Sequence, residues 1–241
     1  MNSLAFRLSL AFFSIVFLGA AVLTLPASFL LNRLPLEKSS LSYTTAYGTA
    51  WQGGVKGAVL GPLSLGHVIY RVSPVSALTG SVRANIFVRS AAVEGQANVT
   101  MGASRLQVSD ARATFDVSKT TLLIPISGRL DVSLNTLDIA SGRCVAADGD
   151  ATITGRVQVA DNQSISLTGP IVCKGDAVTS TLSGALGTNP MVLEIVQGEA
   201  GTVNVLIKIE GLNEEQGLRA SVFGFVKTGS SYEFAQTLQV P

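Results

Sequence analysis

The chain has 241 residues, of which 47% are hydrophobic and 14% are charged, and its formal net charge is +1. With no excess of basic residues to attract a phosphate backbone, a nucleic-acid partner is not expected. A low aromatic content of 6%, together with 24 glycines, favours a sheet-rich protein over a helical bundle.

The first feature along the chain is an uncharged apolar segment from Leu8 to Leu25. As a helix it spans about 27 Å, close to the thickness of the hydrocarbon core of a bilayer. We therefore expect an uncleaved membrane anchor, with a cleaved signal peptide as the alternative. The predicted organisation is a cytoplasmic stub and transmembrane anchor at residues 1–31, a linker at 32–40 and an exported β domain at 41–241. The positive-inside bias is weak, and the short leader favours a cytoplasmic N-terminus.

After Ser39 the sequence changes to short segments in which apolar residues recur at every second position. The alternation is clear in Val203, Val205, Ile207 and Ile209, and it indicates strands with one buried face and one wet face. Turn sequences such as Ser-Gly, Asp-Gly and Thr-Gly separate the segments. We expect about a dozen strands, including 63–72, 81–89, 105–117, 126–134, 151–159, 164–168, 191–197, 202–210 and 218–227.

Two stretches have a helical character. Ser73 is suited to cap a short helix over 73–78, with Pro74 at its first position and Gly80 to end it. A second helical turn is expected at 135–141. The fold prediction is therefore a single all-β domain, a curved antiparallel β-sheet shaped as a half-pipe or a sandwich, with simple up-and-down connections after one N-terminal transmembrane helix.

The sequence has no recognisable catalytic constellation. His67 is the single histidine, and a lone histidine is more often structural than catalytic because general-base chemistry needs a partner and a pocket. Neither a Gly-x-Ser-x-Gly elbow nor a phosphate-binding Gly-rich loop occurs. The adjacent Glu214 and Glu215 are expected to be solvated on a turn. We therefore predict a non-enzymatic protein with no catalytic residues, no cofactor and no metal ion.

Cys144 and Cys173 lie in the part of the chain that the predicted topology exports. An oxidising compartment favours a disulfide between them, and two buried free thiols are the alternative. Such a bond would close a loop of about 30 residues and stabilise the fold by roughly 3–4 kcal/mol.

A cluster of motifs lies between residues 41 and 80. The first is Gly48-Thr49-Ala50-Trp51-Gln52-Gly53, which contains the single Trp, and the second runs from Leu65-Gly66 through Tyr70 and Pro74 to Gly80. Together they resemble the type II secretion system protein N family, also called general secretory pathway protein N. The two cysteines also fit the family's pattern. Family members often carry a second Trp where Tyr70 stands. A fainter similarity extends to the AsmA-like proteins.

The motif residues have a structural interpretation. Gly48 and Gly53 permit tight backbone geometry beside a bulky ring. Trp51 either anchors the first strands by burial or serves as an exposed docking residue.

The resemblance implies a single-pass component of the bacterial inner membrane with its C-terminal domain in the periplasm. Its expected partners are other subunits of the type II secretion machinery, and its expected role is protein transport through protein–protein contacts. The AsmA-like similarity implies the alternative of a lipid-binding or lipid-transfer envelope protein, with the inner face of the sheet as a lipid groove.

Overall fold

The computed structural model describes residues 24–28, 41–61, 63–78, 80–119, 126–157, 163–198 and 202–239. The anchor and linker predicted at 1–31 and 32–40 lie outside these ranges except for residues 24–28. Within the described ranges, no helix has the length and apolar character needed to span a membrane.

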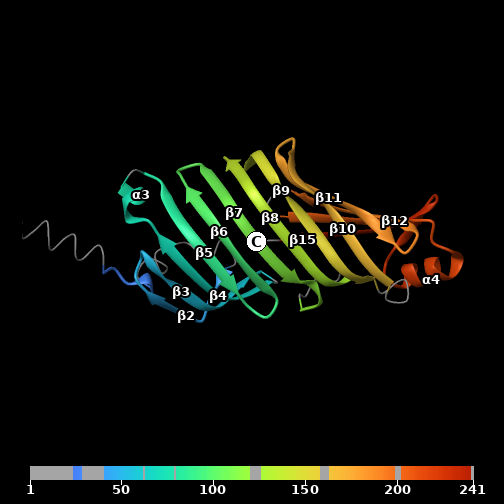
Figure 1. Ribbon diagram of the computed structural model, residues 1–241, viewed down its shortest axis with the longest axis horizontal. Helices are drawn as coiled ribbons and strands as arrows, with labels where there is room; N and C mark the ends of the chain where they lie inside the picture. The colour runs from blue at the N-terminus through green and yellow to red at the C-terminus, as the bar shows by residue number, and fades with distance from the viewer. Residues whose placement is uncertain are drawn as a thin grey trace, which may run out of the picture.

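The described strands form one sheet of fifteen strands, with three short helical segments between residues 74 and 222 (Figure 1). The strands are β1 (Leu41–Ser42), β2 (Thr45–Gly48), β3 (Gln52–Leu60), β4 (Leu63–Val72), β5 (Val82–Arg89), β6 (Val93–Met101), β7 (Arg105–Asp116), β8 (Ile126–Ala140), β9 (Arg143–Val157), β10 (Gln163–Lys174), β11 (Ala177–Leu186), β12 (Asn189–Gln197), β13 (Thr202–Glu210), β14 (Val226–Thr228) and β15 (Ser231–Gln239). The helical segments are α3 (Pro74–Leu78), the 3₁₀ turn η2 (Val117–Lys119) and α4 (Glu214–Val222).

The strands follow a meander, in which each strand from β3 to β12 pairs antiparallel with its neighbours in the chain. At one edge β1 and β2 both pair with β3, and at the other edge β15 lies between β13 and β14. The predicted all-β, antiparallel, up-and-down sheet is confirmed. The described strands form one open sheet, so the sandwich alternative is not observed.

Two of the predicted strands, 63–72 and 202–210, coincide with β4 and β13. The helical turn expected at 135–141 is wrong, because β8 continues as a strand to Ala140 and pairs there with both β7 and β9. The strand expected at 218–227 is also wrong over most of its length. Residues up to Val222 belong to α4, and only the short β14 follows.

Local capping explains helix α4. Asn213 accepts a hydrogen bond from the Gln216 backbone N–H at 2.8 Å, and the Gln216 side chain accepts one from the Asn213 N–H at 3.2 Å. This reciprocal capping box satisfies two N–H groups that a helix start leaves without partners. Glu214 and Glu215 lie in the first turn, where negative charge is favoured. The acidic pair expected on a turn therefore begins a helix.

The registers place side chains of matching character on each face of the sheet. One row across β3 to β9 is made of small and β-branched residues, namely Val55, Val68, Val88, Gly95, Ala113, Val132 and Ala151. We call the face that carries this row the inner face. The neighbouring row, on the outer face, contains Ile69, Phe87, Gln96, Arg112, Ser133 and Asp150.

Burial along the inner face changes from one half of the sheet to the other. In the C-terminal half, the inner side chains form a closed core that includes Leu167, Leu182, Met191 and Ile207, each at most 1% exposed. Ala220 of α4 belongs to the same core. In Figure 1 the C-terminal strands, orange to red, curve behind β8–β10. In the N-terminal half, inner residues such as Ile86 are only partly buried. The sheet is therefore a half-pipe that is filled in its C-terminal half and partly open in its N-terminal half.

Candidate functional site

The first sequence motif forms the hairpin turn between β2 and β3. Gly48 pairs with Gly53 across the turn, and Gly48 has a φ of +85°, in the region that favours glycine. The Thr49 N–H donates to the Gln52 carbonyl at 2.8 Å, and the Thr49 hydroxyl accepts from the Gln52 N–H at 3.2 Å. The motif thus closes a tight hairpin at the edge of the sheet.

Tyr70 on β4 fixes this hairpin from the neighbouring strand. Its hydroxyl donates to the Thr49 carbonyl at 2.9 Å. Burial, and then the nearby Tyr47, raises the pKa of the Tyr70 phenol, which keeps this donor protonated. Trp51 is bound through its backbone carbonyl, which accepts from the Val72 N–H at 2.7 Å, and the residue is half-buried. The structure therefore brings Gly48, Thr49, Trp51, Gly53 and Tyr70 together.

A methyl group at Gly53 would enter this hairpin. A Cβ placed there would lie 2.3 Å from the Tyr47 carbonyl oxygen. Because this oxygen belongs to the backbone, it cannot rotate out of the way as a side-chain atom could. We expect Gly53→Ala to lower the free energy of unfolding by about 1–3 kcal/mol, as measured by urea denaturation. Gly102→Ala is the matched control, because the nearest atom there is 3.8 Å away. Equal unfolding midpoints for the two variants would contradict this account of the motif.

The remaining motif residues, Pro74 and Gly80, follow the C-terminal end of β4, the end that pairs with the start of β3. Pro74 begins helix α3, as predicted. Gly80 follows this helix with a φ of +79°. The Ser76 hydroxyl donates to the Ser73 carbonyl at 2.7 Å and accepts from the Arg83 N–H at 3.0 Å. These residues return the chain from β4 to β5, and Val72 at the end of β4 joins this connection to the β2–β3 hairpin through its hydrogen bond to the Trp51 carbonyl.

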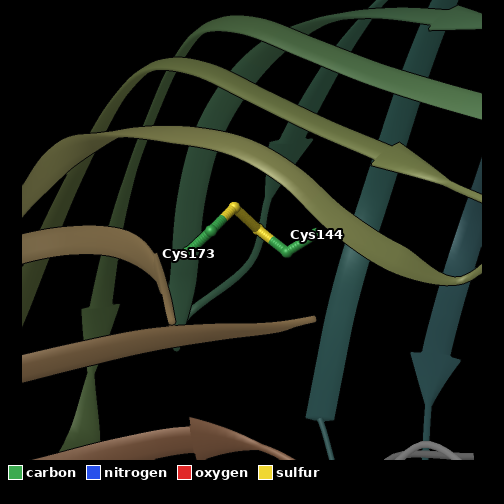
Figure 2. The surroundings of a disulfide bond; sticks show 2 residues. All are labelled: Cys144 and Cys173. Carbon is green, nitrogen blue, oxygen red and sulfur yellow. A yellow bond between two sulfur atoms is a disulfide. The ribbon is translucent and has the colours of Figure 1, made fainter. Parts of the chain in front are cut away.

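Cys144 and Cys173 form a disulfide bond, as predicted (Figure 2). Their Cα atoms are 5.7 Å apart. The regular pairing of β9 with β10 ends at Gly149 and Ile171, so the bond joins the two strands beyond their ladder. The Cys144 N–H also donates to the Asp176 carbonyl at 2.8 Å. The disulfide holds together these ends of β9 and β10, and it uses both cysteines of the chain.

The outer face of the N-terminal half carries a groove of about 890 Å³. Two exposed apolar side chains lie opposite each other in it, Ile69 (39% exposed) and Phe87 (42% exposed). The groove continues across β5 to β9 and carries charged side chains there, among them Arg89, Glu94, Arg112, Asp131 and Asp150. Aromatic and arginine side chains are enriched in protein–protein interfaces, so the groove has the composition of a binding surface.

The sequence analysis did not identify this groove. A signal was present, because Ile86, Phe87 and Val88 are three consecutive apolar residues in a strand whose other positions alternate. Side chains alternate between the two faces of a strand, so Ile86 and Val88 face inward and Phe87 faces outward. An exposed aromatic residue on an outward position is unusual enough to mark a surface.

His67 lies at the border of the same groove. Its Nε2 forms a hydrogen bond with the Tyr47 hydroxyl, and the two rings are 5.6 Å apart. Within the described ranges, no group of three His, Cys, Asp or Glu residues is arranged to hold a metal ion. The geometry around His67 is that of a surface pair between two ring side chains.

The inner face of the N-terminal half is the second candidate surface. Its side chains are almost all apolar, and many of those on β4 to β8 are partly exposed, for example Val68, Ile86, Val88 and Val132. These side chains line an apolar trough that is open in the N-terminal half of the sheet and closed in the C-terminal half. We call it the inner trough.

The fold and these surfaces define a class of protein: an open, curved, all-β scaffold with an interface-like outer groove and an apolar inner trough. The family model described as type II secretion system (T2SS), protein N matches residues 39–220. The chain belongs to this family of type II secretion components, which confirms the resemblance found in the sequence. No curated protein and no solved structure is significantly similar to the chain.

Proposed function

We propose that this protein is a non-enzymatic component of the type II secretion machinery. A transmembrane anchor within residues 1–31 holds it in the inner membrane, and the β domain contacts other secretion subunits in the periplasm. The observation that carries the proposal is the family match over residues 39–220. The disulfide supports an oxidising compartment such as the periplasm.

The outer groove supports a contact role. Ile69 and Phe87 are exposed side by side at the β4–β5 end of a groove that carries charges of both signs on β5–β9, and a docking surface can combine such an apolar contact with polar ones. The contact with another secretion subunit is therefore assigned to the outer face of β4–β9.

The test is secretion of folded exoproteins in the source bacterium. We expect deletion of the gene to abolish or strongly reduce export, and the wild-type chain to restore it. Phe87→Glu should fail to restore export, because it removes an aromatic contact and would require a carboxylate to lose its hydration in the interface. Normal export in the deletion strain would overturn the proposal.

Val172→Glu is the matched control for the groove. Val172 is also 42% exposed, and it lies on β10, which is the fifth strand from β5 in the sheet, outside the groove lining. The same chemical change at equal exposure should leave export intact. Both variants should give the same protein level and the same circular dichroism spectrum as the wild type. If both variants fail, or neither does, the groove is not the contact surface.

The inner trough favours a second candidate function, lipid binding. Its partly exposed apolar side chains are of the kind that could shelter an acyl chain. Native mass spectrometry of the full chain purified in mild detergent, followed by solvent extraction, would detect a bound lipid. Val88→Asp, which places a charge in the trough, should abolish the bound lipid. Protein that retains no lipid under these conditions would rule out this function.

A further inference from the structure

The short described segment that precedes β1 binds the tip of the β2–β3 hairpin. The Ala50 N–H donates to the Leu25 carbonyl oxygen at 2.8 Å, and Pro26 forms an isolated antiparallel bridge with Thr49. Ala27, the next residue, is buried. Leu25 is also the last residue of the apolar segment for which the sequence predicts a transmembrane helix. The hairpin tip therefore holds the chain at the point where the predicted anchor ends.

This contact limits the distance between the hairpin and the bilayer. Given the proposed anchor, on which the following steps rest, Leu25 lies at the boundary of the hydrocarbon core. The headgroup layer beyond that core is about 5–8 Å thick on each side, and one residue of extended chain covers at most about 3.3–3.6 Å. Thr49 and Ala50 are bonded directly to Pro26 and Leu25, so the hairpin tip lies within the headgroup layer or at its surface.

The hairpin tip continues along the same rim of the half-pipe into helix α3. The Val72 N–H, at the end of β4, donates to the Trp51 carbonyl oxygen at 2.7 Å. The Ser73 N–H donates to the Arg83 carbonyl oxygen at 2.8 Å, which joins the start of β5 to the same rim. Figure 1 shows α3 and the end of β6 on this rim. We call this stretch of the rim, made of residues 49–51, 71–76, 82–83 and 101, the anchor rim.

The anchor rim exposes apolar side chains to solvent. Val75 on α3 is 70% exposed, and Val82 and Met101, which lie opposite each other on β5 and β6, are exposed as well. Two aromatic side chains lie beside them on the hairpin, Tyr47, which is exposed, and Trp51, which is partly exposed. Tyrosine and tryptophan are enriched where a membrane meets water. The anchor rim therefore combines apolar and aromatic side chains at the level where the predicted anchor ends.

The charges on this part of the chain are basic. Arg71 and Arg83 are exposed on the anchor rim. Between residues 41 and 109 the single acidic residue is Glu94, and it pairs with Arg89 at the other end of β5. Arginine side chains near a membrane surface are attracted to anionic lipids. The anchor rim thus has both the apolar and the electrostatic character of a surface that binds anionic phospholipid.

We propose that the anchor rim rests on the anionic phospholipid surface of the bilayer that holds the anchor. Val75, Val82 and Met101 lie among the headgroups, and Arg71 and Arg83 contact lipid phosphates. The bilayer is favoured over a protein partner because the bond between the hairpin and the end of the anchor already brings this rim to the headgroup layer. The half-pipe therefore stands on the membrane in one orientation, since the chain is bound to the sheet before the predicted linker begins.

Fluorescence quenching in nanodiscs tests this contact. The full chain is reconstituted in nanodiscs of phosphatidylethanolamine and phosphatidylglycerol, in which a fraction of the lipids carries a nitroxide on the headgroup. Because the native cysteines are bonded to each other, a single added cysteine takes up the fluorophore. We expect quenching at Val75→Cys to be at least about twofold stronger than at Val226→Cys, because only the first position lies in the headgroup layer. Val226 is the matched control, since it is 66% exposed and lies on β14 at the opposite end of the sheet.

A second comparison tests the charges of the anchor rim. In the chain labelled at position 75, Arg71→Gln/Arg83→Gln should lower the quenching by about half or more, because the attraction to anionic headgroups is lost. Arg129→Gln/Arg156→Gln is the control and should leave the quenching unchanged. These two arginines are also exposed, and they lie near the start of β8 and the end of β9, on the opposite rim.

The nanodisc experiment separates a failure of this contact from a failure of the anchor. Recovery of the full chain in the nanodisc fraction shows that the anchor holds, whatever the fluorophore reports. Equal quenching at 75 and 226 in that fraction refutes the membrane contact and leaves the anchor standing, whereas a chain that does not enter nanodiscs refutes both. A fluorophore at 75 that is shielded only after other secretion subunits are added would make the anchor rim a protein contact, which also refutes the membrane contact.

Discussion

Loss of the disulfide is expected to destabilise the fold by roughly 3–4 kcal/mol. The bond links residues 29 positions apart, so its removal frees a long loop of the unfolded chain. It also frees the ends of β9 and β10, which lie beyond the last paired residues of that ladder. Urea unfolding of the Cys144→Ser/Cys173→Ser variant, beside the wild type with and without dithiothreitol, measures the effect.

The double variant also supplies the control. Its unfolding midpoint should not respond to dithiothreitol, and it should match that of the reduced wild type. Circular dichroism should show that its sheet content is retained, because the strands are held by their ladders. A variant as stable as the oxidised wild type would contradict a stabilising role for this bond.

The second large effect is expected in the filled half of the half-pipe. Leu182 on β11 is fully buried and belongs to the main core cluster. Leu182→Ala should cost about 2–5 kcal/mol, since it removes buried methyl groups and leaves a cavity. The measurement is again the free energy of unfolding by urea.

Leu106→Ala is the matched control for this prediction. Leu106 lies on the inner face of β7 and is partly exposed, so the same truncation should cost less than about half as much. Equal losses at the two positions would mean that the N-terminal half is as closed as the C-terminal half, and the inner trough would then not exist as an open surface.

The strands that could be predicted are those with unbroken alternation. β13 was predicted to the residue because its apolar residues recur without interruption between clear turns. β3 was missed because Gly53, Gly54 and Gly57 interrupt its pattern. Helix α4 was missed because it is short and has a weak apolar face, although its capping box at Asn213 and Gln216 was visible in the sequence.

The site was less predictable than the strands. Alternation tells which residues face inward, but it does not tell how far the sheet curves, and the curvature decides whether an inward residue is sealed or partly exposed. Leu182 and Ile86 have equivalent patterns in the sequence and different burial in the fold. The motif around Trp51 located the family and one hairpin, whereas the outer groove depends on side chains brought together from β4 to β9.

The meander order of the strands has a consequence for how such a protein can change. Because each strand from β3 to β12 pairs with its chain neighbours, most contacts join segments that are close in sequence. Each hairpin is held mainly by the hairpins beside it, as in repeat proteins whose stability is a sum over units and their junctions. A whole hairpin can then be gained or lost during evolution if only the contacts between the two hairpins that become neighbours adapt. The number of hairpins, and with it the length of the half-pipe, is therefore free to change.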